Sequence, residues 1–167
     1  QLARRAGASV IGTSRTPEKL DRAARLGLEN AVLADDLWAN RVLELTGGKG
    51  VDVILDLVGS PYLEGNQRVI ATQGRHIVVG VPGGSDTTVS LGRLMGKRAS
   101  IRGTVLRARP LSEKADLSRA FSEDVLPGFT SGELEPVVDK VFPAAEAAEA
   151  HRYMEENRNF GKILLEW

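Results

Sequence analysis

The chain has 167 residues, 42% of them apolar and 26% charged, and its 22 basic residues balance its 22 acidic ones. This length and composition suit one globular domain and exclude disordered, collagen-like and low-complexity chains. The zero net charge argues against nucleic acid and membrane surfaces as partners, and the absence of Cys excludes disulfides, iron–sulfur clusters and Cys-based zinc sites. With no signal peptide and no apolar run near the roughly 20 residues of a membrane span, we predict a cytoplasmic protein.

The chain begins with a stretch that reads as the end of a helix closed by Gly7, so we expect the element before it to be missing. Five apolar runs follow, and a helical stretch separates each from the next. Their starts lie about 20–25 residues apart, which leaves room for one crossover helix between neighbours. This rhythm predicts an α/β fold with a doubly wound parallel sheet. The expected strands cover residues 8–12, 30–34, 51–58, 75–81 and 100–106, and the expected helices cover 17–26, 37–45, 62–71 and 91–97.

The pattern changes in the last quarter of the chain. A long helix is expected over residues 111–130, broken near Pro127. A strand at 137–142, a helix at 144–157 and a final strand at 162–166 follow it. We therefore divide the chain into a sheet domain at 1–135 and a second unit at 136–167.

Ligands of a doubly wound sheet bind beyond the carboxyl ends of its strands, so the residues after each strand are the first candidates. Ser14, Arg15 and Lys19 follow the first strand, and no Asp or Glu lies between Gly12 and Pro17. In a dinucleotide fold an acidic residue here binds the ribose hydroxyl, whereas basic residues accommodate a 2′-phosphate. The segment therefore favours NADP(H), and the alternative is an ordinary solvated helix start.

Two further loops place glycine next to an apolar strand end. Val58 and Gly59 follow the third strand, where Asp56 either faces a sugar or caps the next helix. Gly80 and Val81 end the fourth strand before a Gly-Gly turn, which suits the close approach of a flat ring. Both loops suit plain turns equally well.

No catalytic side chain stands out in the sequence. His76 lies inside an apolar strand and reads as a structural histidine, and His151 lies in the middle of an expected helix. Neither has a sequence neighbour that indicates a triad. The glycine-rich turn at 47–50 enters a strand instead of following one, so it is not a phosphate loop. If the protein is an enzyme, a cofactor carries the chemistry.

Several segments match one family in order: GGKGVDVILDLVG at 47–59, RHIVVGVPGG at 75–84, TVLRARP at 104–110, EAHRYME at 149–155 and GKILL at 161–165. Together they resemble the zinc-free quinone oxidoreductase branch of the medium-chain dehydrogenase/reductases, in the subgroup typified by the tumour-suppressor-inducible quinone oxidoreductase. The resemblance covers essentially the whole chain. It implies a C-terminal fragment: a Rossmann domain without its first strand and glycine-rich loop, followed by a segment that belongs to a missing GroES-like catalytic domain.

The resemblance implies hydride transfer from NADPH to a quinone or a similar activated acceptor, with no metal and no catalytic side chain in this chain. Ser14 and Lys19 match contacts to the 2′-phosphate in the subgroup, and Arg15 fits the same role by its charge. The expected protein partner is a second copy, joined through the edge strand at 100–106, unless Arg102 guards that edge against pairing. Further cofactor contacts are implied for Val58, Gly59, Gly80, Val81, Leu106, Arg107, Phe160, Gly161 and Lys162.

One departure from the family bears on the cofactor. Relatives often carry an Asn-Tyr pair after the second strand, whereas this chain reads AVLAD at 31–35. Loss of that Tyr weakens the affinity for NADPH unless Arg15 compensates. Three alternatives stay open at this point: an NADPH-dependent enone or alkene reductase, a relative of zinc-type alcohol dehydrogenases, and an inactive nucleotide-binding fragment.

Overall fold

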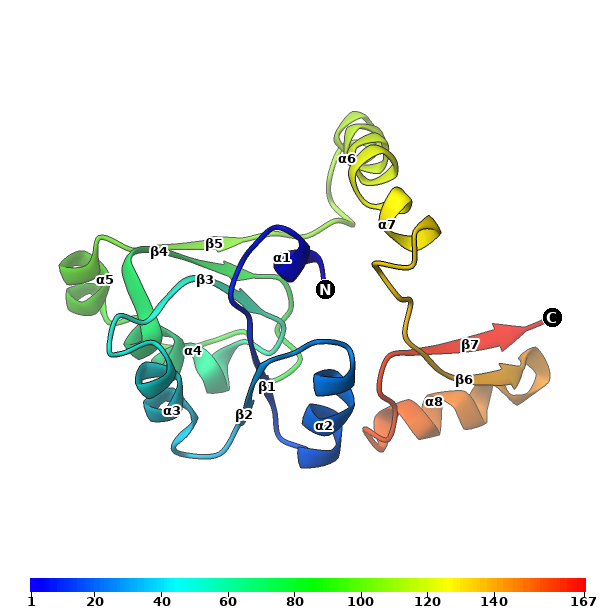
Figure 1. The fold of residues 1–167 in the computed structure, drawn as a ribbon, viewed down its shortest axis with the longest axis horizontal. Coiled ribbons are helices and arrows are strands. Elements are labelled where there is room, and N and C mark those ends of the chain that lie inside the picture. The colour runs from blue at the N-terminus through cyan, green and yellow to red at the C-terminus, as the bar shows by residue number, and fades with distance from the viewer.

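The strands form three separate sheets, and every strand pair is parallel (Figure 1). The computed structural model describes residues 1–167. Helices connect successive strands, so the predicted α/β fold is confirmed. The sheets are β1 (Ile11–Ser14) with β2 (Asn30–Leu33), then β3 (Val51–Asp56), β4 (Ile70–Val78) and β5 (Ser100–Gly103) in that order, and β6 (Val138–Pro143) with β7 (Lys162–Glu166).

The helices begin where the sequence places starting signals. Pro17 stands at the first position of its helix, where a missing N–H costs nothing, and the Ser90 hydroxyl accepts from the Arg93 backbone N–H at 3.4 Å. No helix has both the length and the apolar character needed to cross a membrane. The helices are α1 (Leu2–Arg5), α2 (Pro17–Arg25), α3 (Trp38–Leu45), α4 (Ser60–Val69), α5 (Leu91–Lys97), α6 (Leu111–Asp124), α7 (Leu126–Thr130) and α8 (Ala147–Glu155), with a 3₁₀ turn, η1 (Ala144–Glu146), before the last.

The first two sheets correspond to the two sides of one interrupted Rossmann sheet. The full order of such a sheet is 3-2-1-4-5-6. Here β2 and β1 take positions 3 and 2, whereas β3, β4 and β5 take positions 4, 5 and 6. No strand of this chain takes position 1, and β1 is not hydrogen-bonded to β3. The sequence predicted this gap.

One apolar core contacts both sides of the gap. Val32 of β2, Val42 of α3 and Val69 of α4 are 2–3% exposed, and Ile11 of β1 and Ile54 of β3 pack against them. Each such buried side chain contributes about 1.5–3 kcal/mol through removal of apolar surface from water. This core therefore holds β1 and β3 at a fixed relation although no backbone hydrogen bonds join them.

Several predicted boundaries are wrong, each for a local reason. The helix expected at 62–71 ends at Val69 because Ile70 already pairs with Val51 at the start of β3. The strand expected at 8–12 begins only at Ile11. The strand expected at 75–81 ends at Val78, since the next two backbone N–H groups turn to the carbonyl oxygen of Asp56.

The two segments after the fourth strand also differ from their predictions. The edge strand expected at 100–106 ends at Gly103. Thr104 still donates its N–H to Val78 O at 2.9 Å, but its hydroxyl then accepts from Arg109 Nη2 at 2.9 Å and the chain turns away. The helix expected at 111–130 divides at Val125, just before the predicted break near Pro127.

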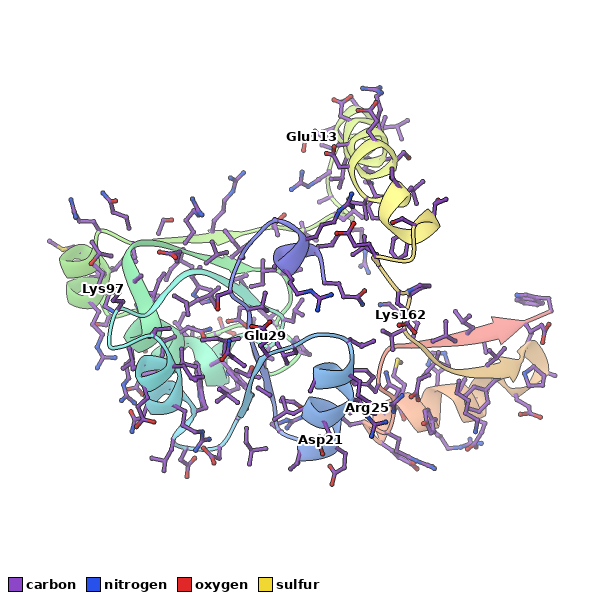
Figure 2. All side chains as sticks on the ribbon, in the orientation of Figure 1. Asp21, Arg25, Glu29, Lys97, Glu113 and Lys162 are labelled. Carbon is purple, nitrogen blue, oxygen red and sulfur yellow. The ribbon has the colours of Figure 1, made fainter.

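The C-terminal unit, formed by β6, α8 and β7, lies beside α2 (Figure 1). Arg22 of α2 forms an ion pair with Asp139 of β6, and its guanidinium carbon lies 4.6 Å from the centre of the Phe160 ring. Charged side chains of both signs cover the outer helices, as Asp21 and Arg25 on α2 and Glu113 on α6 illustrate (Figure 2). The sheet domain thus meets the C-terminal unit through one helix.

Candidate cofactor-binding site

The turn after β1 carries the predicted phosphate ligands. Ser14 is half-buried, and its Oγ accepts from the Thr16 backbone N–H at 3.1 Å, which leaves its own proton free to donate. Arg15 is exposed and forms no ion pair within the chain. A hydroxyl donor and an unpaired guanidinium at the carboxyl end of a parallel strand suit a phosphate group.

Lys19 lies one turn into α2, and its Nζ donates to Asn157 Oδ1 at 2.7 Å. Asn157 follows α8 in the left-handed region, with φ 56°, so the C-terminal unit reaches the turn after β1. Asn157 could not be predicted as part of the site, because no sequence pattern links residues that are 138 positions apart. The only local signal was its residue type, since Asn tolerates positive φ at a helix end.

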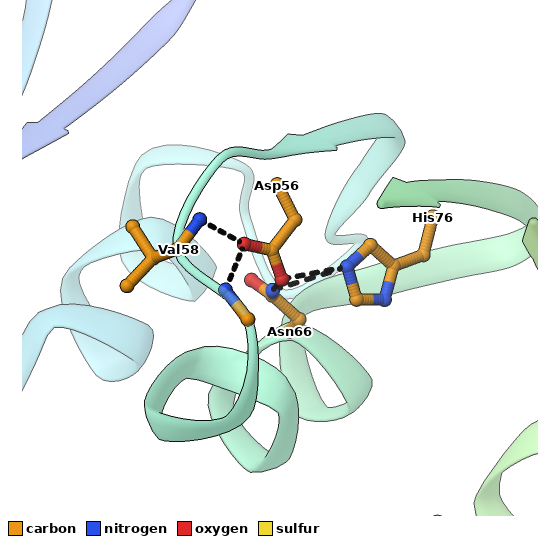
Figure 3. Close-up of polar contacts among 5 residues, drawn as sticks. Asp56, Val58, Asn66 and His76 are labelled. Carbon is orange, nitrogen blue, oxygen red and sulfur yellow. Dashed lines mark hydrogen bonds and ion pairs between the residues drawn. The ribbon is translucent and has the colours of Figure 1, made fainter. Parts of the chain in front are cut away.

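Asp56 at the end of β3 shapes the second predicted loop. Its Oδ1 accepts from the backbone N–H groups of Val58 and Gly59, both at 2.8 Å (Figure 3). The carboxylate therefore holds the turn that precedes α4. The helix itself has no side-chain hydrogen bond at its N-cap, Gly59, so the predicted helix-capping role of Asp56 is wrong. The Asp56 side chain is 3% exposed, and both of its oxygens accept hydrogen bonds from within the protein.

The loops after β3 and β4 are joined to each other. Gly83 donates its N–H to Val58 O at 2.9 Å, and Ser60 donates its N–H to Gly84 O at 3.0 Å. Gly59 has a φ of 94°, and a Cβ on it would lie 2.5 Å from Gly84 O. Only glycine permits this close approach without a shift of the backbone. The structure thus brings Val58 and Gly59 together with the segment at 80–84.

Below the first of these loops lies a buried polar group of three side chains. Asp56 Oδ2 lies 3.0 Å from His76 Nε2, and Asn66 Nδ2 donates to the same oxygen at 3.0 Å (Figure 3). His76 is 1% exposed and its Nδ1 has no hydrogen-bond partner within the protein. The burial of His76 agrees with the prediction that it is a structural histidine. Its contact with Asp56 was not predicted.

Tyr62 lies in the first turn of α4. Burial raises the pKa of its hydroxyl, while the positive charge of Arg15 lowers it and the charge of Asp56 raises it. The Tyr62 ring lies 5.5 Å from the Trp38 ring, centre to centre. The chain therefore has an aromatic hydroxyl near Arg15, although it lacks the Tyr that relatives often carry after the second strand.

The remaining predicted contacts lie further out. Leu106 and Arg107 follow β5 in an exposed turn, where the Arg107 carbonyl oxygen accepts from Lys114 Nζ at 2.9 Å. Gly161, with φ 100°, leads into β7, and Lys162 donates its N–H to Val137 O at 2.8 Å. Phe160 packs on Arg22 of α2, so these three C-terminal residues stand near the Lys19 side of the site. No group of three or more metal-ligating side chains gathers anywhere in the chain.

Comparison with known proteins places this architecture. The model of the family described as "Zinc-binding dehydrogenase" matches residues 1–123, which is most of the chain. The chain belongs to the zinc-binding dehydrogenase family. It is a quinone oxidoreductase-like member of the medium-chain dehydrogenase/reductase superfamily, as the sequence motifs indicated. Members of this family are oxidoreductases that use a nicotinamide cofactor.

Individual relatives agree with this assignment. The chain is 32% identical to a 2-haloacrylate reductase from a Burkholderia species over 98% of its own length, and 32% identical to a quinone oxidoreductase from Pseudomonas aeruginosa over 99%. It covers 49% and 51% of those proteins, so it spans about half the length of the curated relatives it matches. A crystal structure of an NAD-dependent alcohol dehydrogenase superposes over 99% of the chain and 46% of that protein, with a TM-score of 0.86 and 35% identity.

Proposed function

We propose that this chain is the coenzyme-binding part of an NADPH-dependent quinone oxidoreductase. The observation that carries the choice of NADPH is that Ser14, Arg15 and Lys19 lie at the end of β1 and the start of α2, with no Asp or Glu between Gly12 and Pro17. An acidic residue at this position would favour the free ribose hydroxyl of NADH, whereas cations favour a 2′-phosphate. When bound, the cofactor supplies a hydride to the acceptor.

Different residues of the chain bind different parts of this cofactor. The Arg15 guanidinium contributes several fixed donors to the 2′-phosphate, the Lys19 ammonium contributes a point charge, and the Ser14 hydroxyl contributes one donor. Val58 and Gly59 line the adenosine side. Gly80, Val81 and the residues after β5, Leu106 and Arg107, line the nicotinamide side. The segment from Phe160 to Lys162 packs on α2 and borders the 2′-phosphate side.

A quinone acceptor is supported by the motifs at 47–59 and 75–84 and by the similarity to quinone oxidoreductases. A second candidate acceptor is an activated alkene, because the chain is equally similar to a 2-haloacrylate reductase. Both acceptors accept a hydride at an electron-poor carbon or oxygen, so the same coenzyme-binding part serves either reaction. We also propose a homodimer formed through β5, whose outer edge has no partner strand within the chain.

The experiment that tests the proposal is steady-state turnover by the intact protein that contains this chain. NADPH oxidation is followed at 340 nm with a benzoquinone, with an α,β-unsaturated ketone and with a simple ketone as acceptors. The proposal expects turnover with the quinone and a higher kcat/KM for NADPH than for NADH. Faster turnover of the unsaturated ketone would favour the second candidate. If the rate of NADPH oxidation with each of the three acceptors equals the rate without enzyme, both candidate functions are contradicted.

A further inference from the structure

Asp56 holds the loop after β3 and the loop after β4 at the same time. Its side-chain Oδ1 accepts from the N–H groups of Val58 and Gly59, and its backbone carbonyl oxygen accepts from Val79 at 2.8 Å and Gly80 at 3.3 Å. The two loops are then tied to each other by the bond from Gly83 N–H to Val58 O. The Asp56 carboxylate therefore holds the turn at Val58–Gly59 directly, and it reaches the loop after β4 through the bond between Gly83 and Val58.

The Asp56 carboxylate is itself held from the interior. Oδ1 of this carboxylate already accepts from the turn. The orientation of the carboxylate also depends on Oδ2, which contacts His76 Nε2 and Asn66 Nδ2, each at 3.0 Å. All three side chains are buried, so no water competes for these contacts at the surface. Hydrogen bonds to an ionised acceptor in such surroundings are stronger than neutral ones.

His76 Nε2 faces Asp56 Oδ2 at 3.0 Å and also lies 3.3 Å from Asn66 Nδ2. A carboxylate oxygen only accepts, so Nε2 carries the proton that it donates, and Nδ1 is left without a partner inside the protein. A buried nitrogen without a partner is unfavourable compared with an apolar side chain at the same position. The strand around it, RHIVVGV, is otherwise apolar after Arg75, so the requirement for histidine comes from Asp56 and not from the core.

We propose that His76 is a positioning residue of the cofactor site: it acts through Asp56 to fix the turn at Val58–Gly59 and, through that turn, the loop at 80–84. The His76 side chain forms no hydrogen bond with either loop and acts only through Asp56. The inference rests on the proposed function, since these two loops are the ones assigned to the cofactor. Because both cofactors share the adenosine and nicotinamide ends, loss of His76 weakens NADPH and NADH alike, unlike loss of a 2′-phosphate ligand.

The test compares His76→Leu, His76→Gln and the surface control His151→Gln in the intact protein. His76→Leu keeps the bulk and removes the donor, whereas the amide of His76→Gln can reach Asp56 Oδ2. Three quantities are measured for each: the dissociation constants of NADPH and NADH by calorimetry, the melting temperature, and the hydrogen-exchange rates of the Val58 and Gly59 amides. The backbone amide of Ala34, which donates to Ser14 O at 2.8 Å on the other sheet, serves as the internal exchange reference.

The inference expects His76→Leu to raise both dissociation constants about tenfold and to speed exchange at Val58 and Gly59 but not at Ala34. His76→Gln brings both the affinities and the exchange rates most of the way back to the wild-type values, and His151→Gln leaves the affinities and the exchange rates unchanged. If His76→Leu does not fold, His76→Asn takes its place, since its shorter amide stops short of Asp56.

Two results would overturn the inference. One is unchanged affinity and unchanged exchange at Val58 and Gly59. The other is a lower melting temperature with both quantities intact, which would make His76 a purely structural residue. If the wild-type protein binds neither cofactor, the proposed function fails, and the exchange rates at Val58 and Gly59 still decide whether His76 holds the turn.

Discussion

Arg22 Nη2 of α2 lies 2.7 Å from Asp139 Oδ1 of β6, and this ion pair joins the sheet domain to the C-terminal unit. The Asp139 side chain is 5% exposed, and its second oxygen accepts from the Tyr153 hydroxyl at 2.8 Å. Burial would raise the pKa of Asp139, but the hydrogen bonds from Arg22 and Tyr153 outweigh it and hold the pKa below its ordinary value of 3.8.

Replacement of Asp139 by Asn is expected to destabilise the protein by about 1–3 kcal/mol at neutral pH, because a buried hydrogen-bonded charge partner is lost. A lowered pKa in the folded state means that this stabilisation is present above pH 3.8 and is lost as the pH falls through the lowered pKa. Urea unfolding of wild type and Asp139→Asn should therefore show a constant difference from pH 7 to 5 that shrinks below pH 3.8. A difference that disappears already at pH 6 would contradict this account.

The close approach of Gly59 to Gly84 predicts that an added methyl group lowers stability more at Gly59 than at a glycine in open space. Gly59→Ala combines a φ of 94° with a Cβ only 2.5 Å from Gly84 O, so we expect a loss above about 2 kcal/mol and weaker cofactor binding. Gly132→Ala has a φ of 78° in open space, and should cost about 1 kcal/mol with unchanged binding. Chemical denaturation measures both, and equal losses at the two positions would show that the contact between the loops is unimportant.

The contact between Lys19 and Asn157 predicts a specific effect on NADPH. Asn157→Asp keeps the shape of the side chain and tolerates the positive φ, but it places a carboxylate beside Lys19 Nζ. That carboxylate would compete with the 2′-phosphate, so the affinity for NADPH should fall several-fold while the affinity for NADH stays unchanged. Asn40→Asp on α3 adds the same charge away from the site and is the control. Fluorescence titration distinguishes this outcome from an equal loss for both cofactors.

The free edge of β5 predicts a homodimer that cross-linking can detect. The chain has no Cys, so a single Arg102→Cys substitution reports on one position of the edge. If two copies pair at β5 about a two-fold axis, the two introduced thiols come within disulfide distance and oxidise to a covalent dimer. Ser122→Cys on the exposed face of α6 should stay monomeric under the same oxidant. Monomeric Arg102→Cys, together with a monomer mass in sedimentation, would exclude this edge as the interface.

The sequence predicted the order of elements because apolar runs recur about every 20–25 residues, which leaves room for one helix between neighbouring strands. The boundaries of α4 and β4 were wrong because pairing of Val51 with Ile70 overrides the helical pattern there. Local propensity does not encode such a tertiary contact.

The parts of the site that depend on strand register were beyond the sequence. Asp56 and His76 are 20 residues apart, and they meet because β3 and β4 pair with Ile54 opposite His76. Likewise, Asn157 reaches Lys19 only because the C-terminal unit packs on α2. In contrast, Ser14 and Arg15 could be proposed from the sequence alone, because both lie at the end of β1.

Cofactor binding by the intact protein tests the central claim most directly. NADPH and NADH are titrated by calorimetry into wild type and into the double variant Arg15→Ala plus Lys19→Ala. We predict that wild type binds NADPH at least tenfold more tightly than NADH, and that the double variant loses most of this preference by weakening NADPH alone. A ratio of the two dissociation constants that is the same in wild type and in the double variant would contradict the assignment of the turn after β1 as the 2′-phosphate site.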